Sequence, residues 1–151
     1  MRSMKGSVYS LCISDNKGTK KYEVDSARLM EGWGIEGDAH AAQWHRQVSL
    51  LSMADFDFMK EIIPSLKPGD FAENIIIQGL NTKHIKTGDK IIISGNVILE
   101  VTQIGKECHA GCEIQKLTGR CIMPKRGIFA RVNTGGQIKR EDSVVWIKDP
   151  M

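Results

Sequence analysis

The chain has 151 residues, enough for one hydrophobic core and fewer than the length at which cores usually divide, so we expect a single domain over residues 1–151. Its 21 basic and 18 acidic residues give a net charge of only +3 without a run of like charges, which argues against a dedicated nucleic-acid surface. No apolar stretch approaches the roughly 20 residues needed to cross a bilayer, and the first residues do not resemble a secretory signal, so we expect a soluble cytoplasmic protein without membrane association.

Short β-branched runs separated by turn residues predict strands along the chain. The runs are 7–13, 21–24, 47–51, 74–77, 90–93, 97–104, 128–132 and 143–147. Gly-Asp pairs at 37–38, 69–70 and 88–89, together with the pair Gly135–Gly136, supply turn geometry that bulkier residues disfavour. Many short strands with glycine turns predict a mostly β protein built on a closed or nearly closed barrel.

Two segments depart from this β pattern. Ser52, with Asp55 three residues later, precedes apolar residues at helical spacing, and Pro64 ends the segment, so we expect a helix that covers one mouth of the barrel. Residues 109–117 predict a second, shorter helix, with Cys108 at or near its N-terminus and Cys112 about one turn later. A helix N-terminus lowers the pKa of a nearby thiol, so this placement favours a reactive thiolate.

Three of the four cysteines, Cys108, Cys112 and Cys121, lie within fourteen residues. Residues that carry or can carry positive charge precede and follow Cys108 in the sequence: Lys106, His109, Arg126 and Arg131. Cations stabilise a thiolate, so Cys108 is the candidate nucleophile, sulfur carrier or soft-metal ligand. Cys112 either resolves a persulfidated Cys108 or packs the inner face of the short helix, and the spacing of the cluster is poor for structural zinc. Cys12, alone in a strand-like run, is expected to pack as a small hydrophobe.

A second group of candidates lies between residues 32 and 46. Its glycines allow backbone N–H groups to approach an anion, Asp38 and His40 follow them, and Arg46 offers a planar fork suited to phosphate. These residues either line a pocket or form a surface loop in which the tryptophans fill space and Asp38 caps a turn. Farther along, Glu73 and Asn74 either reach the same pocket or stand in water at a strand end.

In this order the motifs resemble those of the MOSC domain family, named for the C-terminal domain of molybdenum cofactor sulfurase. The motifs are Gly34-x-x-Gly37-Asp38-x-His40, His45-Arg46-Gln47-Val48, residues 69–74, Gly88-Asp89, residues 105–109 and residues 127–132. The resemblance covers nearly the whole chain, from about Gly6 to Ile147, which is the core of the expected domain.

The resemblance implies a strongly bent β-barrel, similar to the barrel domain of pyruvate kinase, with a few short helices. It also implies binding of molybdenum cofactor and a cysteine that carries sulfur or binds molybdenum, a role that Cys108 matches best and for which Cys112 is the alternative. On this interpretation the cofactor contacts come from seven residues: Asp38, His40, Arg46, Lys106, His109, Arg126 and Arg131. Pyridoxal phosphate, often named for the family, belongs to larger sulfurases with an aminotransferase-like domain, for which 151 residues leave no room.

Two classes of function follow from these observations. In the first, the chain binds molybdenum cofactor or passes sulfur between a donor protein and a metal-sulfur centre or molybdoenzyme, as a carrier, a sulfur transferase or a cofactor-dependent catalyst. In the second, the barrel is a non-catalytic module for an anionic ligand or a partner protein, and its cysteines are structural. Reduction of N-hydroxylated compounds, known for some relatives, would need bound cofactor and an electron donor.

Overall fold

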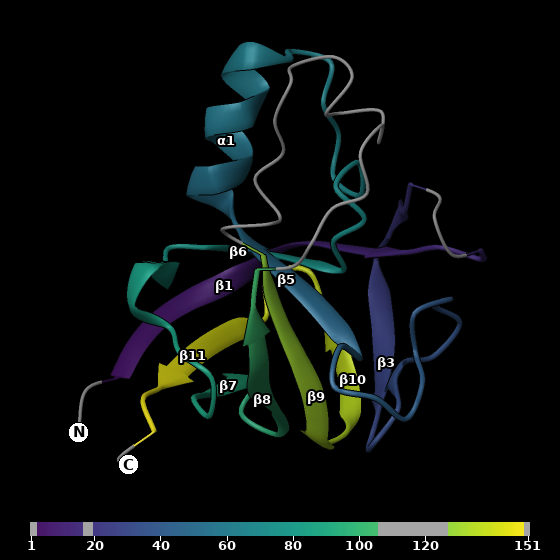
Figure 1. Cartoon of the computed structure of the whole chain (residues 1–151), viewed down its shortest axis with the longest axis vertical. Coiled ribbons are helices and arrows are strands. Elements are labelled where there is room, and N and C mark those ends of the chain that lie inside the picture. The colour runs from purple at the N-terminus through teal and green to yellow at the C-terminus, as the bar shows by residue number, and fades with distance from the viewer. Residues whose placement is uncertain (1–2, 17–19, 106–126, 150–151) are drawn as a thin grey trace.

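A computed structural model describes residues 3–16, 20–105 and 127–149 (Figure 1). The elements, in chain order, are β1 (Ser3–Ile13), β2 (Tyr22–Val24), β3 (Ser26–Met30), β4 (Gly34–Ile35), β5 (Val48–Ser52), α1 (Met53–Ile62), β6 (Ile75–Gln78), the 3-10 helix η1 (Thr82–His84), β7 (Lys90–Ile93), β8 (Val97–Ile104), β9 (Ile128–Thr134), β10 (Gly136–Lys139) and β11 (Ser143–Ile147). Most of the regular structure is therefore β, as predicted.

The described strands close into a barrel because the long strand β1 pairs on both of its edges. The sheet runs β11-β7-β8-β9-β5-β6-β1, and β11 pairs back onto the first half of β1, so seven strands form a closed ring. All pairings in this ring are antiparallel except β5 with β6. The register of β1 against β6 shifts between Val8 and Ser10, and such a bulge bends a strand. The predicted bent, closed barrel is confirmed.

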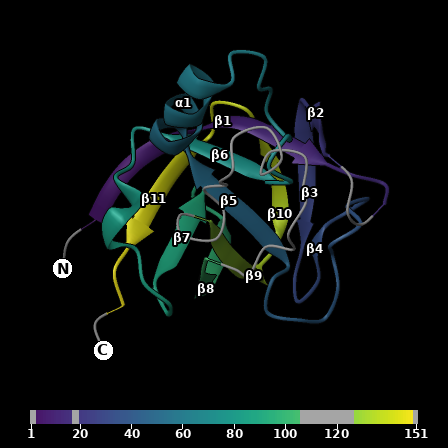
Figure 2. The ribbon, with the colours of Figure 1, turned by 45° about the horizontal axis from the view of Figure 1, so that its top comes forward.

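Two apolar clusters hold the fold together. The barrel interior is filled by aliphatic side chains from the ring strands, among them Val8, Leu50 and Leu99. A second cluster lies between the outer face of the barrel and α1, where Phe56 and Met59 pack with Phe129. Figure 2 shows α1 standing at one end of the barrel, and the small sheet β10-β3-β4 lies along the side of the barrel. The predicted helix is present, and it packs against the outer face of the barrel beside β5 and β6.

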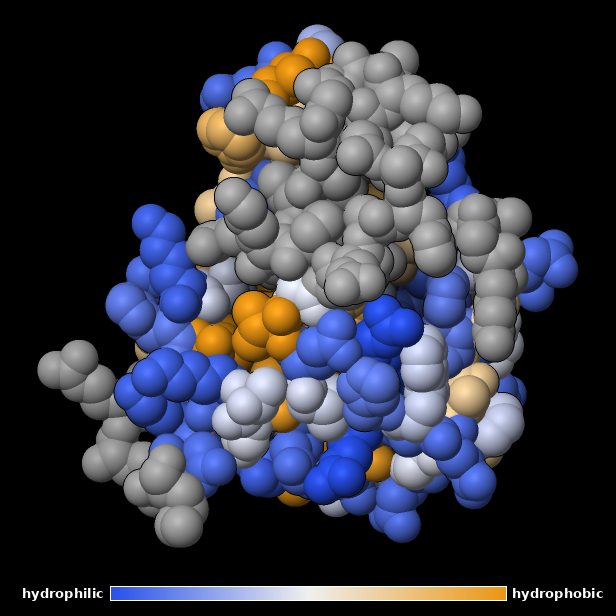
Figure 3. All heavy atoms as spheres, in the orientation of Figure 1, coloured by the Kyte–Doolittle hydropathy of each residue, from blue (hydrophilic) through white to orange (hydrophobic). Residues whose placement is uncertain are grey.

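The start of α1 follows from a local signal. Ser52 Oγ accepts the N–H of Asp55 at 3.1 Å and donates to Asp55 Oδ2 at 2.7 Å, which satisfies an otherwise unpaired donor in the first turn. The helix ends at Ile62, and Pro64 follows its C-cap residue Ile63. Figure 3 shows hydrophobic side chains over α1, where Phe58 and Ile62 are exposed, while mainly hydrophilic side chains cover the visible barrel strands.

The sequence prediction missed the small sheet. Strands β3, β4 and β10 lie outside the predicted runs, because they are short and β3 carries exposed Arg28 between buried Ala27 and Leu29. The turn predicted at Gly135–Gly136 is corrected: Gly136 begins β10 and pairs with Leu29. A Cβ on Gly135 would lie 2.4 Å from the Leu29 carbonyl oxygen, so glycine is needed there for close strand approach.

The helix predicted over residues 109–117 lies outside the described residues. Among the described residues, no helix has the length and apolar character that a membrane span requires.

Candidate functional site

A lysine and an aspartate pair inside the protein beyond the C-terminal end of β1. Lys21, directly before β2, places its Nζ 2.7 Å from Asp38 Oδ1, which follows β4, and 3.2 Å from Ser14 Oγ, which follows β1. The side chains of Lys21 and Asp38 are 1% and 0% exposed. A buried ion pair is tolerated only when each charge has a partner and hydrogen bonds, so these residues act as one unit.

Asp38 also orders the backbone around the pair. Its Oδ1 accepts the N–H of Ser14 at 3.0 Å, and its Oδ2 accepts the N–H of His40 at 3.2 Å. With the Lys21 bond, the carboxylate accepts three hydrogen bonds, which is a pattern suited to its ionised form. Asp38 therefore ties the end of β1 to the loop after β4.

His40 is the part of this cluster that extends toward the surface. Its Nδ1 lies 2.9 Å from Lys21 Nζ, and its ring is only partly buried. The carbonyl of His40 accepts the indole N–H of Trp44 at 2.9 Å. Burial lowers the pKa of Lys21, while the hydrogen bond and the charge of Asp38 act in the opposite direction.

The loop before β6 packs against Lys21 and contains a buried acid. Glu73, fully buried, accepts the N–H of Gly69 at 2.6 Å and the N–H of Phe71 at 3.1 Å, so its carboxyl closes the loop. Burial raises the pKa of Glu73 to about 7, although those backbone hydrogen bonds work against the shift. Glu73 thus does not stand in water, which corrects one of the two interpretations left open by the sequence.

Asn74 is buried as well and joins three strands. Its Nδ2 donates to the carbonyl of Cys12 on β1 at 3.0 Å, and its Oδ1 accepts the N–H of Ser49 on β5 at 3.0 Å, just before β6 begins. Cys12 is buried, as predicted for a small hydrophobe, and burial raises the pKa of its thiol to about 12. This thiol is therefore unreactive at neutral pH.

Arg46 forms a second, cationic part of the site. Its guanidinium carbon lies 4.6 Å from the ring centroid of Trp44 and 5.7 Å from that of Phe129, so the cation contacts two aromatic rings. Its Nε is buried and has no hydrogen-bond acceptor among the described residues. An orphaned buried donor is uncommon, because it loses water without gaining a partner.

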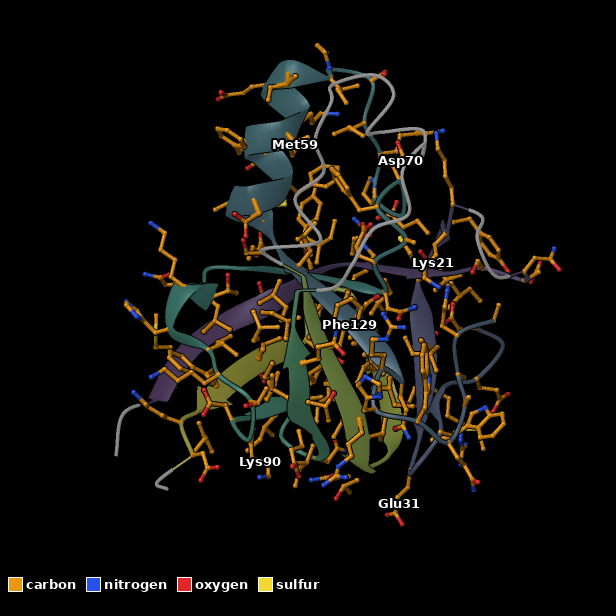
Figure 4. The ribbon with its side chains drawn as sticks, viewed as in Figure 1. Lys21, Glu31, Met59, Asp70, Lys90 and Phe129 are labelled. Carbon is orange, nitrogen blue, oxygen red and sulfur yellow. The ribbon has the colours of Figure 1, made fainter. Side chains whose placement is uncertain are left out.

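The β8–β9 connection leaves and rejoins the barrel beside this arginine. The N–H of Gly105 donates to the carbonyl of Gly127 at 2.7 Å, so the end of the β8 segment and the start of the β9 segment lie side by side. Next to it, His45 Nε2 lies 2.8 Å from Gln103 Oε1, and Gln103 Nε2 donates to the carbonyl of Gly105 at 2.6 Å. Figure 4 shows Lys21 and Phe129 at the same end of the barrel, the end on which α1 stands.

Lys21 and the backbone N–H groups named above already have acceptors, whereas Arg46 Nε has none among the described residues, so Arg46 is the group that suits an anionic ligand. In the described part of the chain, no three His, Cys, Asp or Glu side chains come together as a metal-binding group.

The profile of the MOSC domain matches residues 37–145, which span the Asp38, Arg46 and Gly105–Gly127 parts of this site. The chain belongs to the MOSC domain family. No protein of curated function matches its sequence.

Solved structures show the same fold. YuaD from Bacillus subtilis superimposes with a TM-score of 0.81 at 20% identity, over 97% of this chain and 98% of that one. YiiM from Geobacillus stearothermophilus gives 0.68 at 16% identity, over 95% and 75% of the two chains, and YiiM from Escherichia coli gives 0.62 at 20% identity, over 98% and 70%. At these identities the likeness concerns the fold alone.

The structure brings some of the predicted site residues of this MOSC domain together. Asp38 and His40 are in one hydrogen-bonded cluster, and Arg46 is joined to it through Trp44. Arg131 is exposed on β9, two residues beyond Phe129, where its Nη2 lies 3.2 Å from Glu100 Oε2. The remaining predicted site residues lie outside the described residues: Lys106, Cys108, His109, Cys112 and Arg126.

Sequence reasoning missed the centre of the cluster. The sequence predicts Lys21 only as the first residue of a strand, and it predicts no functional role for Ser14. Nothing in the local sequence marks either one, because their partners lie 17 and 24 positions away along the chain. One of the two open interpretations gave the tryptophans only a space-filling role, whereas Trp44 lies against the Arg46 guanidinium and donates its indole N–H to the carbonyl of His40.

Proposed function

We propose that this MOSC domain binds molybdenum cofactor beside Arg46 and carries sulfur on Cys108. Membership of the family supports the cofactor, and the buried Nε of Arg46, which has no acceptor among the described residues, is the observation that carries the proposal. When bound, the cofactor would supply a phosphate-bearing pterin and a metal that accepts soft sulfur ligands.

Arg46 fits the phosphate of such a ligand. A guanidinium presents five N–H donors in a planar fork, and phosphate oxygens are the acceptors that this fork matches best. The Nε of Arg46 has no acceptor among the described residues, and its aromatic neighbours Trp44 and Phe129 hold the plane in place. A phosphate on Arg46 would give the orphaned donor a partner and would find the fork already oriented.

Chain connectivity supports a role for the cysteine-rich segment at this barrel end. Lys106 follows Gly105 and Arg126 precedes Gly127 in the sequence, and a hydrogen bond joins Gly105 to Gly127. Cys108 is three residues beyond Gly105, which limits their Cα separation to about 11 Å. Lys106, His109 and Arg126 would favour the Cys108 thiolate and add cations for an anionic ligand.

The sulfur step needs only a nucleophilic thiolate. The Cys108 thiolate would attack the terminal sulfur of a donor protein's persulfide, forming a new sulfur–sulfur bond while the donor's own sulfur–sulfur bond breaks and its thiolate leaves. Oxidation states balance within this exchange, because the sulfane sulfur moves from one thiolate to another. The partners are then a sulfur-donor protein and a molybdoenzyme or metal-sulfur centre that receives the sulfur.

Two measurements test this function on the whole chain. Purified protein mixed with molybdenum cofactor should form a complex, and it should accept one sulfane sulfur from a persulfide donor. Cys108→Ser should lose sulfur loading, whereas Cys12→Ser, at the buried thiol, should keep it. Unchanged loading and affinity in Cys108→Ser would remove that thiol from the mechanism.

The alternative, a non-catalytic module with structural cysteines, gives a different thiol titration. A Cys108 that reacts with a thiol reagent only above the ordinary thiol pKa of about 8.5 would favour the module. Reaction well below that value would favour the sulfur carrier.

A further inference from the structure

His45 is held to β8 through both its side chain and its backbone. Its Nε2 lies 2.8 Å from Gln103 Oε1, and its carbonyl accepts a hydrogen bond from Thr102 Oγ1. Consecutive strand residues normally point to opposite faces of a sheet, yet Thr102 and Gln103 both reach His45. The register of β8 against β9 shifts between Val101 and Gln103, and such a bulge turns a side chain away from its regular direction. The bulge therefore aims two neighbouring side chains at one loop residue.

The amide nitrogen of Gln103 fixes which end of the amide faces the imidazole. Gln103 Nε2 donates to the carbonyl of Gly105 at 2.6 Å, and a carbonyl oxygen can only accept. A flipped amide would set its own oxygen against that carbonyl and lose the bond. Oε1 therefore faces His45, and an amide oxygen has no hydrogen to give. The hydrogen of this contact belongs to Nε2 of His45.

This assignment decides what the other ring nitrogen of His45 can do. A neutral imidazole has a hydrogen on one nitrogen and a lone pair on the other, so a hydrogen on Nε2 makes Nδ1 an acceptor. Nδ1 of the exposed His45 forms no hydrogen bond among the described residues. We infer that Gln103 is a positioning residue, which holds His45 so that Nδ1 accepts an N–H or amino group of the ligand bound beside Arg46.

The ligand part of this inference rests on the proposed function and sharpens it. His45 and Arg46 contact the same indole: the His45 ring centroid lies 5.7 Å from that of Trp44, and the Arg46 guanidinium carbon lies 4.6 Å from it. A guanidinium binds an anionic group, whereas a lone pair attracts N–H groups and repels phosphate and carbonyl oxygens. A ligand that uses both residues has an anionic end and a heterocyclic end with N–H donors, as a phosphate-bearing pterin has.

Nuclear magnetic resonance of the ligand-free chain tests the assignment at His45. The protein is labelled with ¹⁵N at histidine and measured at a pH high enough that the imidazole signals no longer change. Long-range proton–nitrogen correlations should then place the hydrogen of His45 on Nε2, and more completely than at the exposed reference residue His84, because the bond to Gln103 Oε1 favours this form. A hydrogen on Nδ1, or a tautomer mixture equal to that of His84, would overturn the inference.

A variant of Gln103 tests the positioning role. Gln103→Leu removes the amide and keeps a side chain of similar size, so the tautomer mixture of His45 should move toward that of His84. Thr102→Val is the matched control, because it removes the bond to the His45 carbonyl and leaves the imidazole contact in place. An unchanged His45 spectrum in Gln103→Leu would show that Gln103 does not position the ring, and the wild-type spectrum decides the tautomer if that variant does not fold.

Two substitutions of His45 separate its ring nitrogens in ligand binding. The side-chain oxygen of asparagine is as many bonds from Cβ as Nδ1 is, and the amide nitrogen of glutamine is as many bonds from Cβ as Nε2 is. Glutamine thus keeps the donor to Gln103 and loses the acceptor. His45→Gln should bind isolated molybdenum cofactor about fivefold to tenfold more weakly than the wild type, as loss of one hydrogen bond implies, and more weakly than His45→Asn. His84→Gln should bind as the wild type does.

The outcomes distinguish this inference from the function on which it rests. If the wild type binds no cofactor, the proposed function fails, while resonance still decides the tautomer of His45. If the cofactor binds and His45→Gln binds it as tightly as the wild type, Nδ1 is not an acceptor for the ligand. Tighter binding by His45→Gln than by His45→Asn would assign the contact to Nε2 and would likewise overturn the inference.

Discussion

The backbone of Gly69 lies directly against the backbone of Lys21. The N–H of Lys21 donates to the carbonyl of Gly69 at 3.0 Å, and a Cβ on Gly69 would lie 2.1 Å from the Lys21 carbonyl oxygen. Glu73, four residues later, holds the N–H of Gly69. The loop before β6 and the buried lysine therefore form one unit, and a disturbance in the loop reaches the site.

Gly69→Ala should destabilise the protein by about 3 kcal/mol or more. Gly69 has a φ of +96°, a conformation that costs a residue with a side chain about 1 kcal/mol or more. The clash between the added Cβ and the backbone atoms of Lys21 adds the cost of overpacking. Gly95→Ala is the matched control, because Gly95 also has a positive φ, +76°, but a Cβ there meets nothing within 4 Å. Urea denaturation should show a clearly larger loss of unfolding free energy for Gly69→Ala than for Gly95→Ala. Equal losses would mean that the loop shifts to accommodate the added methyl group.

Removal of one partner of the buried ion pair should cost more than removal of both. Lys21→Met leaves the Asp38 carboxylate without its cation, and Asp38→Asn leaves the ammonium without its anion, so each should lose about 3 to 5 kcal/mol of unfolding free energy. The double variant Lys21→Met with Asp38→Asn should lose much less unfolding free energy than the two single variants lose together. Strict additivity in a double-mutant cycle would contradict a tightly coupled pair.

The buried Glu73 predicts a fall in stability as pH rises through the neutral range. Its pKa is raised from 4.5 to about 7 in the folded protein, so between these values the folded state binds more protons than the unfolded state. The contribution of Glu73 is therefore fully present below about pH 4.5 and is lost by about pH 7, a span of about 3 kcal/mol.

Glu73→Gln tests this prediction, because glutamine resembles the protonated acid and does not titrate. Unfolding free energies of the variant and the wild type, measured across this range, should diverge in favour of the variant as pH rises. A constant difference between the two proteins would show that Glu73 keeps the same charge throughout.

Arg46→Met should weaken binding of molybdenum cofactor by about tenfold to a hundredfold, the loss expected for hydrogen bonds between a cation and phosphate. The cofactor affinity of Arg46→Lys should lie between the affinities of Arg46→Met and the wild type, because lysine keeps the charge without the planar fork. Arg28→Met is the control, since Arg28 is exposed on β3. Equal affinities of Arg46→Met and Arg28→Met in equilibrium titration would exclude Arg46 from the binding site.

Local sequence signals were sufficient for the barrel strands and for the helix. The predicted runs 90–93, 97–104 and 143–147 coincide with β7, β8 and β11, because each combines β-branched residues with a flanking turn. Ser52 and Pro64 bracket α1 through capping and the loss of a backbone donor, which are interactions within a few residues. The order of motifs was likewise enough to indicate the family.

Only the tertiary structure decided which of the candidate residues belong together. Lys21, Asp38 and His40 meet because the end of β1, the start of β2 and the loop after β4 converge, and no pattern within one segment encodes that encounter. Burial depends on the same convergence, and it turns Glu73 and Asn74 from apparent strand-end polar groups into interior hydrogen-bonding centres. A strand is specified by its own residues, whereas a charged cluster is specified by the path of the whole chain.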